Sequence, residues 1–168
     1  WGTNPKGTIN KILPKKEGGY TTADYYEIGK MCMHPDMPKN SESQMMRDLV
    51  TWLKELNKTR DTPLSYLYTM ADGIVGKAGY VYQASNFYYS ESFWTSVYRD
   101  EDGNRFHTRS IRGLCEENNN WCKKKYPNWN KDQLFDLTFD FMDLVGMEKI
   151  YGLMFRYIYP LSKKAKKV

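Results

Sequence analysis

The sequence predicts an α/β fold in which a mixed β-sheet is flanked by helices. Two short apolar runs, residues 27–33 and 64–70, carry the aliphatic and aromatic side chains that suit buried strands. Residues 41–56 between them keep the apolar spacing of a helix. A strand, a helix and a second strand in this order predict a crossover unit with parallel strands. Two alternating runs within residues 93–111 predict an antiparallel hairpin, so the sheet is expected to be mixed.

Length and composition predict one domain, residues 1–168, with a basic tail from about residue 162. The chain is 40% hydrophobic and 15% aromatic, which is typical of a globular protein. The sequence contains no apolar run of about 18 residues and no signal peptide, so we expect no membrane partner and a cytoplasmic location. Residues 1–5 resemble the end of a central strand, so the first elements of the domain are expected to be absent.

The predicted helix at 41–56 begins at a polar cap. Either Asn40 or Ser41 precedes the apolar stripe, and Ser41 with Gln44 matches a capping box. The first turn of a helix exposes backbone amides and the positive end of its dipole. This end is therefore a candidate site for a phosphate or a carboxylate.

A carboxylate follows the second predicted strand directly. Residues 64–70 run into Ala71, Asp72 and Gly73, and ligands of open α/β sheets bind beyond the carboxyl ends of the strands. Asp72 is thus a candidate functional residue, although the same pattern is typical of a carboxylate that only caps the next turn. A short helical element follows and is expected to place polar side chains nearby, namely Tyr80, Tyr82 and Asn86.

The hairpin at 93–111 turns at residues 100–104, where Gly103 suits positive φ. His107 and Arg109 stand two residues apart on its second strand and therefore share a face. His107 could act as a base and Arg109 could bind a phosphate. An exposed strand face that pairs across to Tyr98 or Arg99 explains the same pattern. Further along, the pattern predicts helices at 111–125 and 130–144 and a last strand at 149–160.

The net charge of +5 is concentrated in short basic clusters, which include residues 123–125 and 163–167. Basic clusters among aromatic side chains are typical of proteins that bind a phosphate backbone. Fourteen tyrosines and five tryptophans also supply many stacking faces for a base held outside a helix. The alternative is a solvated surface with a frayed basic tail.

Three cysteines do not make an even disulfide framework, which favours a reducing compartment. Cys115 and Cys122 are expected to be packed thiols. Cys32, His34 and Asp36 are conceivable metal ligands, but their spacing matches no recognised zinc or iron pattern.

Four segments, taken in order, resemble the Mom family of phage DNA-modification proteins, a divergent branch of the GNAT acyltransferase superfamily. They are EIGKMCM (27–33), PKNSES (38–43), TMADG (69–73) and GYVYQASNFYY (79–89). The resemblance spans residues 1–112, and residues 156–164 resemble the end of such proteins. Two features depart from the expected patterns. Gly29-Lys30 replaces the Ser-Arg of the family, and residues 38–43 lack the glycines of an ordinary GNAT phosphate loop.

The resemblance implies a GNAT-like central mixed sheet and a transferase that adds an acyl or carbamoylmethyl-type group to the N6 amine of adenine in double-stranded DNA, which protects phage DNA from restriction. It implies an acetyl-CoA or related acyl donor, and iron by analogy. Alternatives are a GNAT enzyme acting on a protein or small-molecule amine, and a non-catalytic DNA-binding module. The oligomeric state stays open, with a dimer among the options.

Site residues follow from the resemblance together with placement in the predicted fold. Asp72 would be the general base or would orient the substrate, Tyr82 would be an acid or oxyanion donor, and Lys30 would position the reactants. Residues expected to bind the donor are Asn40, Ser41, Glu42, Ser43, Tyr80 and Asn86. Residues expected to bind nucleic acid are His107, Arg109, Lys163 and Lys164.

Overall fold

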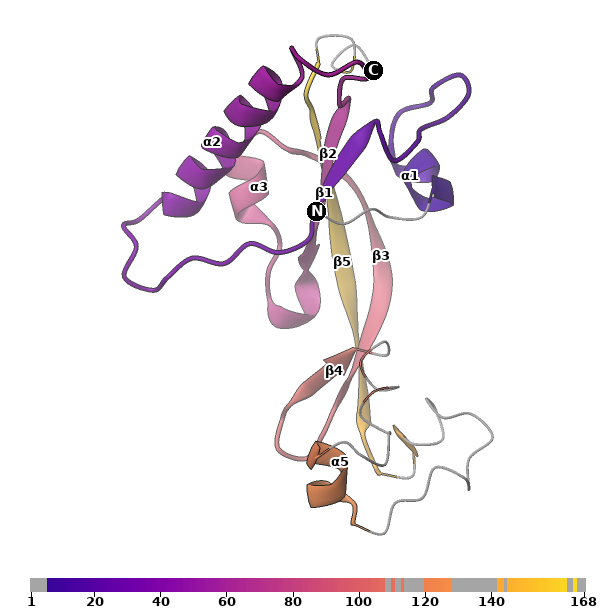
Figure 1. Cartoon of the computed structure of the whole chain (residues 1–168). Helices are drawn as coiled ribbons and strands as arrows, with labels where there is room; N and C mark the ends of the chain where they lie inside the picture. Colours follow the sequence, from indigo (N-terminus) through magenta and orange to yellow (C-terminus); the bar gives the residue numbers. More distant parts are fainter. Residues whose placement is uncertain are drawn as a thin grey trace. The chain divides into compact units, whose positions relative to one another are not determined.

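The computed structural model describes residues 6–107, 110, 113, 120–127, 142–143, 145–162 and 165. The chain forms two compact units, of which the first comprises Trp1–Phe93 with Leu153–Val168 and the second comprises Trp94–Gly152. Five strands form one sheet in the order β1-β2-β5-β3-β4 (Figure 1). Helices accompany this sheet, so the predicted α/β class with a mixed sheet is confirmed.

The first unit holds most of the regular elements, and two strands continue from it into the second unit. The elements within the first unit are α1 (Lys6–Ile12), β1 (Tyr25–Ile28), α2 (Ser41–Leu56), β2 (Tyr66–Asp72), the 3₁₀-helix η1 (Gly73–Val75) and α3 (Tyr80–Ala84). The two shared strands are β3 (Tyr88–Arg99) and β5 (Glu148–Pro160), and the second unit adds β4 (Arg105–His107) and α5 (Asn120–Lys125).

Strand β2 is paired on both edges. It runs parallel to β1, from Tyr25 opposite Tyr66 to Ile28 opposite Thr69, which confirms the parallel pair of the predicted crossover unit. Its other edge is antiparallel to β5 over the whole length of β2. The predicted last strand at 149–160 is therefore confirmed to within one residue, and it lies beside β2 rather than at the edge of the sheet.

Side chains alternate between the two faces of a strand, and five of the seven residues of β2 are buried, so both of its faces are covered. Helices α2 and α3 lie on one side of the sheet and α1 lies on the other (Figure 1). The core on the α2 side is made of Met46, Val50, Leu53, Leu64, Leu67, Ala71, Tyr82, Phe87, Tyr157 and Leu161. The core on the α1 side is made of Ile9, Ile12, Leu13, Tyr20, Tyr25, Tyr66 and Tyr68.

Two local predictions are wrong. The first strand begins at Tyr25 and ends at Ile28 instead of covering 27–33, because Gly29 weakens a strand and the β1–β2 pairing stops there. The capping box is also absent. Asn40 is the N-cap of α2 without a side-chain cap bond, and the Ser41 hydroxyl donates instead to the Pro38 carbonyl at 2.7 Å.

The second unit contains the predicted hairpin. Strands β3 and β4 pair from Val97 opposite His107 to Arg99 opposite Arg105. Gly103 has a φ of 82°, which confirms the need for positive φ in the turn. A small core packs Tyr98 against side chains that include Cys122, Met142 and Met147, so Cys122 is the packed thiol that was predicted.

Other predictions for the second half of the chain fall largely outside the described residues. Helix α5 lies within the predicted helix at 111–125, and the structure describes only part of the remainder. Most of the predicted helix at 130–144 and Cys115 lie outside the described residues. Within the part of the chain that is described, no helix is both long enough and apolar enough to cross a membrane.

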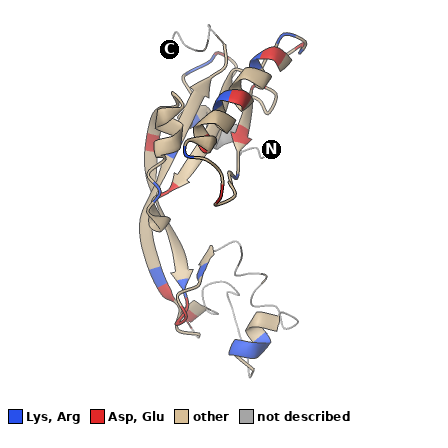
Figure 2. Cartoon of the chain, turned by 90° about the vertical axis from the view of Figure 1, so that its left-hand side faces the viewer, with Lys and Arg blue, Asp and Glu red and all other residues tan. Residues whose placement is uncertain are grey.

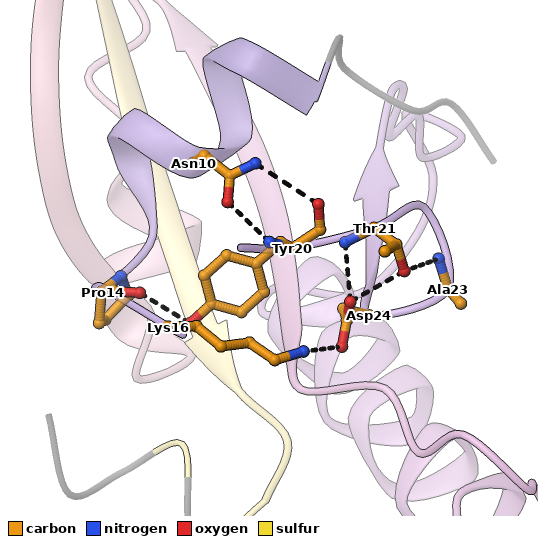
Figure 3. A network of polar contacts seen from close by, with 7 residues as sticks. All are labelled: Asn10, Pro14, Lys16, Tyr20, Thr21, Ala23 and Asp24. Carbon is orange, nitrogen blue, oxygen red and sulfur yellow. Dashed lines mark hydrogen bonds and ion pairs between the residues drawn. The ribbon is translucent and has the colours of Figure 1, made fainter. Parts of the chain in front are cut away.

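A polar network fixes the connection between α1 and β1 (Figure 3). Asp24 is buried, and its carboxylate accepts hydrogen bonds from the Thr21 amide at 2.8 Å and the Thr21 hydroxyl at 2.9 Å. Lys16 Nζ lies 2.7 Å from the same carboxylate. Burial alone would raise the pKa of Asp24, but these donors outweigh it and hold the pKa below its ordinary value.

We expect Asp24→Asn to lower the free energy of unfolding by about 2 kcal/mol at neutral pH, because charged hydrogen bonds are lost. The folded-state pKa of Asp24 is depressed, so its contribution is full above the unfolded pKa of about 3.9 and is lost as the pH falls through the folded value. Urea denaturation of both proteins across pH should show a difference that shrinks below about pH 4. The exposed Asp61→Asn serves as control, and a pH-independent difference would contradict the account.

Two glycines let the segment after β2 approach β5 closely. A Cβ on Gly73 would lie 2.9 Å from Phe155 Cε2, and a Cβ on Gly79 would lie 2.9 Å from Tyr157 Cζ. The Tyr157 hydroxyl donates to the Ala78 carbonyl at 2.5 Å. These contacts hold the start of α3 against β5. A side chain at Gly73 would also meet the Leu153 carbonyl and require the backbone to move, whereas one at Gly79 would displace the Tyr157 ring.

Gly79→Ala should destabilise the chain by about 3 kcal/mol, because overpacking against Tyr157 adds to the strain of a positive φ. Gly76→Ala is the matched control, since Gly76 also has positive φ but has open space around it, and it should cost about 1 kcal/mol. Urea denaturation compares the two variants. Equal losses would show that the close approach to Tyr157 is unimportant.

Candidate functional site

A hollow of about 390 Å³ runs along α2, from Asn40 to Lys54, beside the end of α3, and the two helices pack against each other. Three predicted site residues line it, namely Asn40, Ser43 and Asn86. The structure therefore brings together residues from two of the segments that resemble the Mom family. Residues that were not predicted complete the lining, and they include Arg47, Lys54, Ser85 and Tyr159.

The hollow is equipped to bind an anion. Arg47 and Lys54 are two turns apart on one face of α2, and Lys54 Nζ lies 3.2 Å from the Tyr159 hydroxyl. Ser85 Oγ is buried and has no hydrogen-bond partner among the described residues. Such an unpaired hydroxyl costs free energy unless a ligand satisfies it.

Two asparagines at this hollow adopt left-handed backbone conformations. Asn40 has a φ of 72° and Asn86 has a φ of 61°, and among the described non-glycine residues no others have positive φ. Asparagine tolerates this conformation better than most residues, but the conformation still costs free energy. Strain of this kind clusters at functional sites, so it adds to the evidence that the hollow is a site.

A second hollow, of about 470 Å³, lies on the other side of the α2 N-terminus, and Asn40 and Ser43 line it as well. Predicted Glu42 and the metal candidate His34 also line it. Predicted Ser41 shapes the loop through its bond to Pro38. The predicted donor-binding residues of the PKNSES segment thus surround the start of α2, as the sequence suggested.

Lys30 lies beyond the end of β1, at an apolar hollow of about 590 Å³ that Met31, Met45 and Leu49 also line. The paired part of β1 stops at Ile28, whereas β2 continues to Asp72. The residues of β2 that follow Thr69 therefore have no β1 partner along that edge. Lys30 accordingly stands on a segment that follows the strand, and not within it as predicted.

Asp72 ends β2, as the sequence predicted. Its carboxylate accepts a hydrogen bond from the Ile74 amide at 2.8 Å and caps η1, so the capping role is present. A function beyond capping stays a prediction. Tyr82 is buried in the core, with its ring centroid 5.6 Å from those of Phe87 and Tyr157. Tyr80, in contrast, is 76% exposed.

The predicted set of nucleic-acid-binding residues stays a prediction, because most of its members are not among the residues described. His107 belongs to the second unit and is exposed, and Arg109, Lys163 and Lys164 lie outside the described residues. Figure 2 shows charges of both signs along α2 and a basic band on α5. Within that band, Lys125 forms ion pairs with Glu101 and Asp102, and the hydrogen bond to Asp102 raises the pKa of Lys125.

The predicted metal candidates do not form a metal site. Cys32 is exposed, and His34 contacts Asp36 at 3.4 Å with both side chains largely in solvent. Within the described ranges, no group of three His, Cys, Asp or Glu side chains could hold a metal ion. Iron and zinc sites need three or four converging ligands, so these residues do not fit the iron that the resemblance implies.

Some site residues carry a sequence signal that the prediction missed. The seven-residue spacing of Arg47 and Lys54 places two cations on one helix face, and this could have been found from the sequence. Tyr159 carries no such signal, because its position depends on the pairing of β5 with β2. Ser85 also carries no signal in the sequence, since its burial depends on how α3 packs.

Comparison with known proteins decides the family. The model of the Mom protein family matches residues 1–168. The chain belongs to the Mom family. It is also similar to the methylcarbamoylase mom of Escherichia phage Mu, with 27% identity over 169 residues that cover 99% of the chain and 59% of the phage Mu protein. The chain therefore spans about three-fifths of the length of this curated relative.

The anion-binding account of the first hollow predicts that Arg47→Gln with Lys54→Gln weakens binding of inorganic pyrophosphate about tenfold, because charged hydrogen bonds to phosphate are lost. Isothermal titration calorimetry of the unaltered and double-variant chains measures the change. Lys58→Gln is the control, since Lys58 pairs with Glu55 outside the hollow. Equal affinities, or no measurable binding by the unaltered chain, would contradict the assignment.

Proposed function

We propose that this Mom-family chain is a phage DNA-modifying transferase that adds an acyl or carbamoylmethyl-type group to the N6 amine of adenine in double-stranded DNA. The observation that carries the proposal is the match of the family model to all 168 residues. The phage Mu relative is a methylcarbamoylase, which agrees with transfer of a carbonyl-containing group. Protection of phage DNA from restriction would follow from such a change.

The described residues fit a donor of the acetyl-CoA type. Arg47 and Lys54 would bind its phosphates along the α2 face of the hollow, which reaches the N-terminus of the helix at Asn40, where exposed amides favour an anion. Ser85 Oγ would gain the hydrogen-bond partner that the described residues do not give it. The donor supplies an activated carbonyl group, and the residues of the chain bind and orient it.

The acceptor requires a base and a way to hold adenine. For an acyl thioester donor, a nitrogen–carbon bond forms, a carbon–sulfur bond breaks, and the amine proton leaves through a base and ends on the departing sulfur. Asp72, at the carboxyl end of β2, is the proposed base. The exposed ring of Tyr80, on the α3 segment that follows, would offer a stacking face to a base outside the helix.

Asp72→Asn tests this role. An asparagine oxygen can still accept from the Ile74 amide, so we expect the melting temperature to change by no more than about 1 °C while modification falls about 100-fold. The readout is protection of plasmid DNA, recovered from cells that express the chain, against restriction endonucleases with adenine in their sites.

The control is the exposed Asp61→Asn, which should protect as well as the unaltered chain. Full protection by Asp72→Asn would exclude Asp72 as the base. Cleavage of DNA from cells with the unaltered chain would contradict DNA modification. Two alternatives would then be tested: acetylation of a free amine without DNA, and salt-dependent DNA binding without any change of mass.

A further inference from the structure

A charged cluster lies on the face of the sheet opposite α2 and α3. The Arg156 side chain is only 16% exposed, and its Nη1 donates to Glu91 Oε1. The guanidinium carbon stacks 4.0 Å from the centroid of the Phe93 ring. An ion pair and a ring stack therefore hold one arginine in a fixed orientation inside the first unit.

Tyr68 adds a buried hydroxyl to this cluster. It lies on β2, diagonally across from Arg156, because Tyr68 pairs with Ile158 and Met70 pairs with Arg156. The side chain is fully buried, and neither its hydroxyl nor Arg156 Nε has a partner with good hydrogen-bond geometry among the described residues. Burial raises the pKa of Tyr68, the charge of Arg156 and a poorly aligned side-chain hydrogen bond from it lower the pKa, and Glu27 and Glu91 raise it further.

A structural role alone does not explain this arrangement. The Glu91 side chain is 44% exposed, so its ion pair with Arg156 is only partly buried and adds little stability. Two buried polar atoms without a well-formed hydrogen bond cost free energy, and native structures keep few of them without a reason. The cluster lies outside the hollows at the α2 N-terminus, so the donor phosphates do not account for it.

The geometry of the guanidinium indicates what it would bind. Glu91 occupies Nη1, which leaves the edge formed by Nε and Nη2. That edge presents two parallel N–H donors, the pattern that matches the oxygens of a carboxylate or the oxygen of a carbonyl group. Because Nε is fully buried and the side chain is only 16% exposed, only a small planar group could approach this edge, and the backbone of a DNA duplex could not.

We propose that Arg156 binds a carbonyl or carboxylate oxygen of the group that the enzyme transfers. Glu91 and Phe93 fix the guanidinium, and Tyr68 is a positioning residue whose hydroxyl lies beside it. The identity of the ligand rests on the proposed transferase function, whereas the existence of the site rests on the geometry alone.

Direct binding tests the site without relying on catalysis. Saturation-transfer NMR would compare acetate, acetamide and dimethyl phosphate as probes of the unaltered chain and of Arg156→Lys, which keeps the charge but loses the planar edge. We expect acetate or acetamide to bind the unaltered chain and to lose about tenfold in affinity in the variant. Equal binding by both proteins, no binding, or dependence on Arg156 for dimethyl phosphate alone would overturn the proposal.

Tyr68→Phe separates function from packing. Removing a buried hydroxyl that has no well-aligned partner should leave the melting temperature unchanged or raise it, while acetate or acetamide binding and DNA modification fall about tenfold. Tyr66→Phe is the matched control two residues away, because its hydroxyl donates to the Ala165 carbonyl at 3.2 Å. It should lose stability and keep binding.

The two proposals fail separately. Unmodified DNA from cells with the unaltered chain would contradict the transferase, and the probe measurements would still decide the Arg156 site. Unchanged probe binding and unchanged modification by Tyr68→Phe would exclude its positioning role.

Discussion

The candidate site depends on how closely the segment after β2 approaches β5. Gly73 and Gly79 lie so near Phe155 and Tyr157 that no side chain fits at either position. Tyr157 completes this contact, because its hydroxyl donates to the Ala78 carbonyl and accepts from Gln83 Nε2 at 2.9 Å. The contact fixes Asp72 before it and α3 with Asn86 after it. The hollow beside α2 therefore takes its shape from a strand near the end of the chain.

Strands β2 and β5 also connect the two faces of the sheet. On one face, the packing of α2 and α3 leaves a hollow with the cations Arg47 and Lys54. On the other, α1 covers the core and Arg156 pairs with Glu91. The covering strand β1 stops at Ile28, so the last residues of β2 form an edge where these faces meet.

Local signals in the sequence predicted the elements that local interactions decide. The apolar spacing of α2, the buried run of β2 with Asp72 at its end, and the hairpin turn at Gly103 were all predictable. The end of β1 was not, because sheet pairing determines where that strand stops. The pair of Glu91 and Arg156 joins residues 65 positions apart, and no periodicity in the sequence relates them. Family resemblance named residues around the α2 N-terminus but missed Arg47, Lys54 and Tyr159, which line the hollow.

If the proposed function is right, the chain changes the chemical composition of adenine in DNA. Mass spectrometry of nucleosides digested from plasmid DNA of cells expressing the chain would detect that change. We expect a heavier deoxyadenosine that is absent from cells without the chain, and the added mass would identify the transferred group. Deoxyadenosine of unchanged mass alone, from cells in which the chain is folded and abundant, would exclude the proposed function.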